Sequence, residues 1–249
     1  MRPIFRRIGG VGGGIFLLFL FWFILSLYAG KEALPYPHST FTYLFFLIRE
    51  GEIWNPISIT LGRVGLGFFL TMLTGTGMGI VAGRTYLGDE VSSFYLPIWM
   101  SIPDLIIVFA LIMVFGARTL FPSLAAVAIV TPFAATNIRD AMKGLPKSLI
   151  EISNSYNASL TQKIREIYIP YLIPSLVATS RIGFAIVWKI VFLAEVFGSA
   201  SGLGYVVKMA FTVFNLKKLL SLLIIIVAIV IGLEQFLRMV ENMVTKWRK

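Results

Sequence analysis

The chain has no cysteine and a single histidine, His38, and only 14% of its 249 residues are charged. Without cysteine it forms no disulfide, carries no thiolate nucleophile and offers no cysteine-based metal site. One histidine cannot build a multi-histidine metal site, and His38, in a Pro-Tyr-Pro-His stretch, is expected to lie in an exposed loop. Paired catalytic carboxylates are also missing. The composition therefore argues against an enzyme, and no metal site is predicted.

Apolar residues are what the chain has in excess. They make up 57% of it, and the mean hydropathy is +0.86. Soluble domains are about 45–50% apolar and about 25% charged. The formal net charge is +10, but the Lys and Arg residues cluster between apolar runs rather than on one soluble face. This distribution favours basic cytoplasmic loops of a membrane protein over nucleic-acid binding.

Six apolar runs are predicted to cross the bilayer as helices, because roughly 20 apolar residues cover a hydrocarbon core of about 30 Å. They occupy residues 15–29, 57–83, 94–116, 119–138, 171–197 and 219–237. The fold class is thus all-α and polytopic, with residues 1–249 forming one transmembrane domain. Residues 30–56 are expected to hold a short amphipathic helix at the interface, and residues 198–218 a loop.

Two of these runs have a second interpretation. The basic start before the first run is typical of a signal peptide, but no small-residue cleavage pattern follows, so a first membrane helix is predicted. The third run contains Pro97 and Pro103. Either neighbouring helices accommodate these prolines, or they bend a helix that lines a pathway.

The distribution of Lys and Arg predicts the topology. With the N terminus inside, thirteen of the 22 fall on the inner side and six on the outer side, and three lie within spans. The inner set includes the C-terminal Lys246, Arg248 and Lys249. Because cytoplasmic loops are rich in Lys and Arg, both termini are predicted to be cytoplasmic in a multi-pass plasma (cell inner) membrane protein.

Glycines in the second span are predicted to serve helix packing. Gly75, Gly79 and Gly83 lie four residues apart, and small residues at this period let two membrane helices approach closely. A phosphate-binding loop is the alternative for this glycine-rich stretch. Met78 and Arg84 stand where the Walker pattern requires Gly and Lys, so no nucleotide site is predicted.

A polar, charged segment, residues 151–170, separates the fourth and fifth spans. Residues 147–156 and 158–168 are predicted as two short helices joined at Asn157, since Asn tolerates the left-handed backbone that ends a helix. Pro170 is expected to fix the start of the next span. Such a hairpin suits docking of a soluble partner, and an ordinary solvated loop explains the same residues equally well.

The same segment resembles the EAA loop of ABC-importer permeases, whose pattern is E-A-A, three residues, G, nine residues and I-x-L-P. The matching positions are Glu151, Asn157, Ile167, Ile169 and Pro170. Ile152 and Ser153 replace the two alanines, so the motif is degenerate. The resemblance covers nearly the whole chain: the Ser-Ile-Pro-Asp-Leu, Leu-Pro-Lys-Ser-Leu-Ile-Glu and Leu-Ala-Glu-Val-Phe-Gly-Ser-Ala-Ser-Gly segments are similar to permeases of sulfonate, nitrate and taurine importers.

This resemblance implies a permease that pairs with a second permease, receives a small anionic solute from an extracytoplasmic binding protein, and is driven by two cytoplasmic ABC ATPases. It implies an ATPase-coupling element that contains Glu151, Asn157, Ala158, Ser159 and Pro170. ATP and Mg would bind to the partner subunits, and no cofactor to this chain. A homodimer is expected, although the degenerate motif leaves a pair of unlike permeases open.

Ionisable residues within the spans are candidates for the pathway, because charges in the bilayer are costly. They are Arg63, Asp104, Arg181, Lys189 and Glu195. Asp104 and Arg181, at equal depths, are predicted to face one another as a structural pair or as part of the pathway. Lys189 and Glu195 are six residues apart on one helix and cannot pair directly. Arg63 either attracts an anion or snorkels to the interface.

These charges also support the alternative from another class. An ion-coupled secondary transporter or channel subunit would use Asp104, Lys189 and Glu195 itself, without ATP. It gives the polar segment at residues 151–170 no role.

Overall fold

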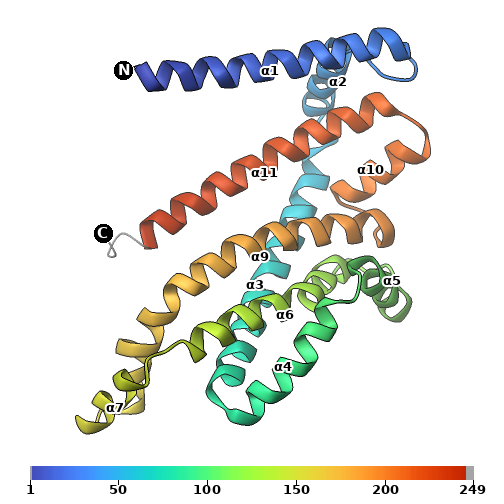
Figure 1. The fold of residues 1–249 in the computed structure, drawn as a ribbon. Helices are drawn as coiled ribbons and strands as arrows, with labels where there is room; N and C mark the ends of the chain where they lie inside the picture. The colour runs from blue at the N-terminus through green and yellow to red at the C-terminus, as the bar shows by residue number, and fades with distance from the viewer. Residues whose placement is uncertain (1, 245–249) are drawn as a thin grey trace. The chain divides into compact units, whose positions relative to one another are not determined.

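The computed structural model describes residues 2–244, and the ordered elements in this range are all helices (Figure 1). The all-α fold predicted from the sequence is confirmed. The C-terminal cations Lys246, Arg248 and Lys249, which contribute to the predicted inner charge, lie outside the described residues. The chain divides into two compact units, and each is built from separate stretches of sequence.

The first unit holds the residues up to Asn55 together with Val206–Glu234. Its helices are α1 (Arg2–Ala29), α2 (Pro37–Arg49), most of α10 (Leu203–Thr212) and most of α11 (Leu216–Val244). Buried hydroxyls join them: Ser221 Oγ donates to the Thr40 carbonyl at 2.9 Å, and Ser26 Oγ donates to the Pro35 carbonyl at 3.3 Å. The α2 helix, expected as a short interfacial helix, thus packs against α11.

The second unit holds Pro56–Tyr205 together with the described residues from Gln235 on. Its helices are α3 (Trp54–Arg84), α4 (Tyr86–Met100), α5 (Asp104–Phe115), α6 (Phe121–Lys143), α7 (Lys147–Ser155), α8 (Leu160–Lys163), the π-helical η1 (Ile164–Tyr168) and α9 (Ile169–Gly198). The α6 and α9 helices pack along one another at its centre (Figure 1). Ala134 and Ile138 of α6 and Val187 and Val191 of α9 are fully buried in this unit.

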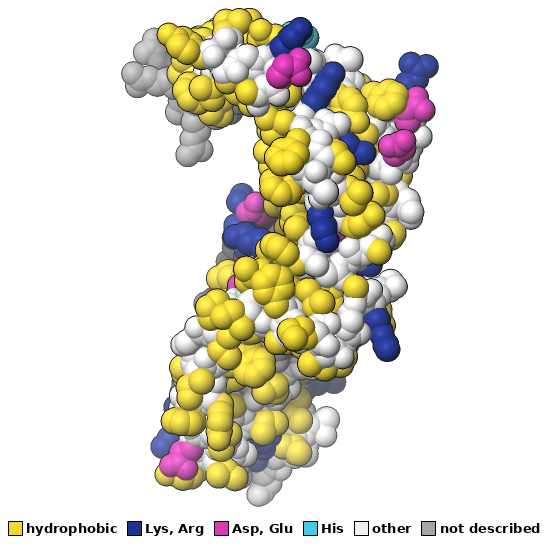
Figure 2. All heavy atoms as spheres, turned by 90° about the vertical axis from the view of Figure 1, so that its right-hand side faces the viewer, with side chains coloured by type: hydrophobic (Ala, Val, Ile, Leu, Met, Phe, Trp, Pro, Cys, Tyr) yellow, Lys and Arg dark blue, Asp and Glu magenta, His cyan; other side chains and the backbone are white. Residues whose placement is uncertain are grey.

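Within residues 2–244, four helices are long and apolar enough to cross a membrane: Trp54–Arg84, Phe121–Lys143, Leu160–Gly198 and Leu216–Met239. The pair α4 and α5 adds a fifth candidate, and the apolar part of α1, Phe16–Ala29, is shorter. The visible face in Figure 2 is largely hydrophobic, with charged side chains scattered over it. On α11, Leu223, Val227 and Ile231 are each about half exposed, as expected of a helix that meets lipid.

The third predicted span, residues 94–116, is not one straight helix. α4 begins at Tyr86 and ends at Met100, and α5 starts at Asp104 after a bend of 92°. Pro97 lies inside α4, whereas Pro103 directly precedes α5. The break therefore coincides with Pro103, which cannot donate the backbone hydrogen bond that would continue the helix.

The predicted loop at residues 198–218 is wrong in its middle part, which forms the ten-residue helix α10. Leu203 and Ala210 are buried, seven residues or two helical turns apart. The helix ends where Phe214 adopts a φ of 52°, and Asn215 Oδ1 then accepts the backbone N–H of Lys218 at 2.9 Å to start α11. The glycines and serines at residues 198–202 obscured the apolar periodicity that follows.

Candidate functional sites

The polar segment begins with α7 and turns sharply at Asn157, whose φ of 51° is the expected left-handed conformation. The Ala158 N–H bonds the Ser153 carbonyl at 2.9 Å, and the Asn157 N–H bonds the Asn154 carbonyl at 2.9 Å. These two bonds satisfy carbonyls that the last turn of a helix leaves free. The turn is therefore specified by local backbone chemistry at Asn157.

The next helix starts immediately with a capping box. Ser159 Oγ accepts the Gln162 N–H at 3.3 Å, while Gln162 Oε1 accepts the Ser159 N–H at 2.7 Å. Such reciprocal bonds satisfy two amide donors at a helix start. Ala158 and Ser159 thus place the beginning of α8.

The second arm of the predicted hairpin is not a separate short helix. α8, η1 and α9 run on as one helical stretch from Leu160 to Gly198. In the π-helical part the Ile169 N–H bonds the Ile164 carbonyl, five residues back. Pro170 follows at the start of α9 and has no N–H to donate, and the wider turn before it accommodates this loss. Pro170 thus lies in the first turn of α9, where the next span was expected to start, but the helix before it continues into α9 without a break.

The hairpin exposes apolar side chains. Ile152 is 54% exposed, Tyr156 83% and Leu160 57%, and Glu151 is also exposed beside them. At its base, the Arg84 guanidinium lies 5.3 Å from the centre of the Tyr168 ring, which connects the end of α3 to η1. A structured hairpin with exposed apolar groups offers a surface on which another protein can dock.

A second cluster is built on a buried ion pair between α3 and α9. Arg63 Nη1 lies 2.8 Å from Glu195 Oε1, and the side chains are 5% and 0% exposed. Thr60, one turn from Arg63 on α3, donates to the Glu195 carboxylate at 2.8 Å. The Gly204 N–H supplies a further bond to Oε2 at 2.9 Å. Every charged group in this low-dielectric site is thus hydrogen bonded, as burial of charge requires.

The same ion pair anchors two connecting segments. Arg63 Nε donates to the Thr119 carbonyl at 2.9 Å, and Arg63 Nη1 and Nη2 donate to the carbonyl and Oγ of Ser201 at 2.8 and 2.9 Å. Thr60 Oγ1 also accepts the Leu203 N–H at 2.8 Å. The guanidinium therefore fastens the segment before α6 and the segment after α9 to α3.

Two glycines make room for the carboxylate. Gly202 has a φ of 98°, and a Cβ there would collide with the Glu195 carboxylate. At Gly204 a Cβ would lie 2.6 Å from Glu195 Cβ. Neither glycine, nor Thr60, Thr119 or Ser201, was identified from the sequence, although the Gly-Ser-Ala-Ser-Gly-Leu-Gly run is a signal of close backbone approach.

The intramembrane charges thus pair differently from the prediction. Arg63 neither snorkels nor attracts a free anion, because Glu195 neutralises it. The predicted pair of Asp104 and Arg181 is wrong: Arg181 Nη1 lies 3.8 Å from Glu241 Oε2, and Asp104 is exposed without an ion pair in the described part of the chain. The depth count assumed a straight third span, whereas Asp104 begins a helix beyond a 92° bend.

Lys189 is the remaining intramembrane candidate. It is exposed on α9, and among residues 2–244 it has no hydrogen bond or ion pair. Of the five predicted intramembrane charges, only Arg63 and Glu195 are brought together.

The glycine ridge of α3 lies against α6. An added Cβ would lie 2.5 Å from Ala134 Cβ at Gly75, 2.7 Å from the Ala135 carbonyl oxygen at Gly79, and 2.5 Å from Met142 Cβ at Gly83. These contacts are closer than any side chain allows, so the helix separation depends on all three glycines.

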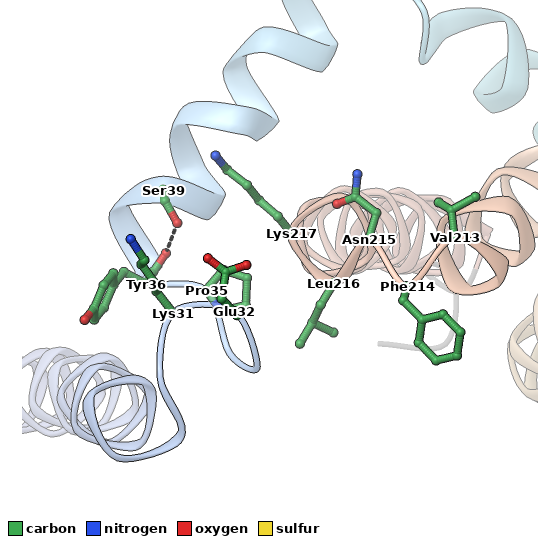
Figure 3. Close-up of a pocket in the computed structure, with 10 residues that line it drawn as sticks. All are labelled: Lys31, Glu32, Pro35, Tyr36, Ser39, Val213, Phe214, Asn215, Leu216 and Lys217. Atoms are coloured by element: carbon green, nitrogen blue, oxygen red, sulfur yellow. Dashed lines mark hydrogen bonds between the residues drawn. The ribbon is translucent and has the colours of Figure 1, made fainter.

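A recess of about 510 Å³ opens within the first unit, between the α1–α2 connection and the start of α11 (Figure 3). Lys31, Glu32 and Lys217 contribute charged side chains to its wall, and Ser39 Oγ donates to the Tyr36 carbonyl at 2.8 Å. Lys217 Nζ also lies 5.6 Å from the centre of the Tyr43 ring. The recess is polar and was not predicted from the sequence.

Comparison with known proteins identifies relatives of the whole chain. The putative aliphatic sulfonates transport permease protein SsuC of Bacillus subtilis is 25% identical over 219 residues, which cover 86% of this chain and 78% of that protein. The taurine transport system permease protein TauC of Escherichia coli is 23% identical over 253 residues, covering 98% of this chain and 92% of that protein. The predicted similarity to sulfonate and taurine permeases is confirmed.

Solved structures support the fold. A chain of the MetNI methionine ABC transporter in an inward-facing conformation matches with a TM-score of 0.64 at 22% identity, covering 75% of this chain and 93% of that chain. Residues 75–246 match the family model described as binding-protein-dependent transport system inner membrane component. The ion-coupled alternative gains no support from these matches. Because the family match covers most of its length, the chain belongs to the inner membrane components of binding-protein-dependent ABC transport systems, which are non-catalytic permease subunits.

Proposed function

We propose that this permease, paired with a second identical copy, forms the pathway through which a small organic anion of the sulfonate or taurine kind enters the cell. The substrate class rests on the names of the two relatives at 25% and 23% identity. The observation that carries the coupling mechanism is the exposed hairpin at residues 147–163, which presents Ile152, Tyr156 and Leu160 on a locally fixed backbone.

In this proposal two cytoplasmic ATPase subunits, which bind ATP and Mg, dock on the two hairpins of the dimer. Glu151 orients α7 on the ATPase, Asn157 makes the turn, and Ala158 and Ser159 begin the arm that continues into α9 past Pro170. Closure of the ATPases drives the permease between inward-open and outward-open states. That coupling requires the ATPase dimer to bind one state more tightly than the other.

The proposed orientation places both termini and the hairpin in the cytoplasm. The recess lined by Lys31, Glu32 and Lys217 would then face outward, where an extracytoplasmic binding protein delivers the solute. Its two lysines and one glutamate suit polar contacts with that protein, which are expected to weaken at high ionic strength.

Copurification tests the coupling role. In a strain that expresses the permease with its ATPase, Tyr156→Asp combined with Ile152→Asp is expected to abolish recovery of the ATPase with the permease, because buried carboxylates would oppose docking. Tyr28→Asp is the matched control, since Tyr28 is 91% exposed but lies on α1, away from the hairpin in sequence.

ATP hydrolysis and uptake complete the test. Reconstituted wild-type complex with its binding protein is expected to take up taurine or a short alkanesulfonate only when ATP is supplied. Full ATPase recovery with the double variant, or uptake that persists without the ATPase, would contradict the proposal.

A further inference from the structure

Lys189 lies too deep in its helix to reach either end. It is nine residues from Gly198 and twenty from Ile169, the two ends of α9. At 1.5 Å per residue these separations are about 13 Å and about 30 Å. The nearer end is two and a half turns away, further than the four-carbon stem of a lysine extends. Snorkelling to an interface therefore does not account for this charge.

Pairing within the chain does not account for it either. The ammonium is exposed and has no hydrogen bond or ion pair among residues 2–244, whereas Arg63 and Glu195, the other two charges in this part of the unit, neutralise each other. A charged side chain at such a depth is found facing a bundle interior or a water-filled cavity rather than lipid.

The surroundings of Lys189 on α9 leave space beside it. Ala178, Arg181, Ala185 and Lys189 are exposed and follow helical spacing, so they lie on one face. The opposite side, with Val187, Val191 and Ala194, is buried in the core. These two alanines and two cations form a strip along α9, with Ala185 between the cations. Arg181 lies 3.8 Å from Glu241, so Lys189 supplies the strip's positive charge that no carboxylate of residues 2–244 neutralises.

We infer that this strip faces the aqueous pathway of the assembled transporter, and that Lys189 is a specificity-determining residue that contacts the anionic group of the solute. An ammonium is a strong point donor for sulfonate or carboxylate oxygens. The strip occurs twice in a dimer, which places one Lys189 from each copy along the pathway. The inference rests on the proposed function for the existence of that pathway.

The absence of native cysteine makes a direct test possible. In the purified complex of permease and ATPase in lipid nanodiscs, Ala185→Cys places a reporter thiol one turn from Lys189. The probes are two membrane-impermeant methanethiosulfonates, the anionic ethylsulfonate and the cationic ethyltrimethylammonium reagent. Both reagents are expected to label the reporter thiol. The anionic reagent is expected to react faster than its reactivity toward a free thiol in solution predicts.

The charge effect is isolated by adding Lys189→Gln to the reporter. The ratio of anionic to cationic labelling rates is expected to fall by about fivefold or more, since a unit charge within about 6 Å acts in opposite directions on the two reagents. Lys189→Arg is expected to preserve the ratio. Tyr28→Cys serves as an accessible control, and Leu223→Cys, on α11, as a lipid-facing control that stays unlabelled.

Two results would overturn the inference. One is a reporter at residue 185 that stays unlabelled in complexes that retain their ATPase, as it would in lipid or in a dry contact between copies. The other is an unchanged rate ratio in the Lys189→Gln background. Labelling does not depend on the solute, so a wild-type complex that fails to transport sulfonates but shows the expected ratios would refute the proposed substrate and leave the pathway assignment standing.

Discussion

Arg63 and Glu195 are separated by 132 residues in sequence, yet their side chains form an ion pair of 2.8 Å that is almost fully shielded from solvent. Around this pair, backbone groups from three further segments are hydrogen bonded, so the pair organises one end of the second unit. The ion pair has a structural role, because each charge is neutralised by the other and both side chains are hydrogen bonded within the same chain.

Glu195→Gln is expected to destabilise the permease by about 3–5 kcal/mol, because it leaves the Arg63 guanidinium buried without a counter-charge. The free energy of unfolding in mixed micelles titrated with SDS measures this. Replacing both residues with methionine should recover part of the loss, though not all of it, since the Gly204 N–H and Thr60 hydroxyl lose their acceptor. Lys189→Met is the control, with an expected change below about 1 kcal/mol; an equal loss in the control would contradict the assignment.

Gly202→Ala is expected to reproduce much of the Glu195→Gln defect without removing any charge. The new Cβ would occupy the space of the Glu195 carboxylate, and the φ of 98° is unfavourable for alanine. Gly62→Ala on α3, where nothing lies within 4 Å of the new Cβ, should leave stability unchanged or slightly raised. The two variants are compared by thermal unfolding, followed as the loss of monodisperse protein. Equal midpoint temperatures would argue against the close approach of Gly202 to the Glu195 carboxylate.

The glycine ridge gives a prediction with its control on the same helix. Gly75→Ala or Gly79→Ala is expected to cost about 1–3 kcal/mol, since the added methyl overpacks the contact with α6. Gly77→Ala, two residues away with no atom within 4 Å of its new Cβ, should have no such cost. The same SDS titration measures the free energy of unfolding of these variants. Equal values for Gly77→Ala and the two ridge variants would contradict the close contact between α3 and α6.

At Asn157, substitution by glycine should be neutral or stabilising, whereas valine should cost about 1–2 kcal/mol in local stability because a β-branched side chain resists a φ of 51°. Limited proteolysis within residues 150–165 reports on local opening, and ATPase recovery reports on docking. Ser155→Val, two residues away in α7, serves as the control, since the Ser155 hydroxyl donates to the Glu151 carbonyl of the same helix. Faster cleavage of the glycine variant than of the valine variant would contradict the role given to the turn.

What the sequence could predict depended on how local each feature is. The apolar runs predicted an all-α membrane protein, and the properties of asparagine predicted the backbone at Asn157. The pairing of Arg63 with Glu195 could not be predicted from the sequence. Counting residues along a helix gives the depth of a side chain in the bilayer, but not which neighbouring helix it faces. A signal was present, since Arg63 and Glu195 lie six and two residues from the ends of their predicted spans, residues 57–83 and 171–197.

The remaining misses have similar causes. The bend before Asp104 moved that residue away from the position that a straight helix predicts, so the Asp104–Arg181 pair failed with it. α10 was hidden by the small residues that precede it. The helical continuation from Leu160 to Gly198 was missed because Pro170 was expected to start a new helix, whereas the helix before it runs on through the proline.

The uninterrupted stretch from Leu160 to Gly198 has a mechanical consequence. Its 39 residues correspond to about 58 Å of helix, with the hairpin at residues 147–163 at one end and Glu195 close to the other. If the hairpin receives the ATPase as proposed, a force applied beside Ser159 would be transmitted along one continuous helix to the segment that Arg63 holds. Two irregularities lie near its hairpin end, the π-helical turn at Ile164–Tyr168 and Pro174 inside α9, and under the proposed coupling their stiffness sets how much of the displacement is transmitted.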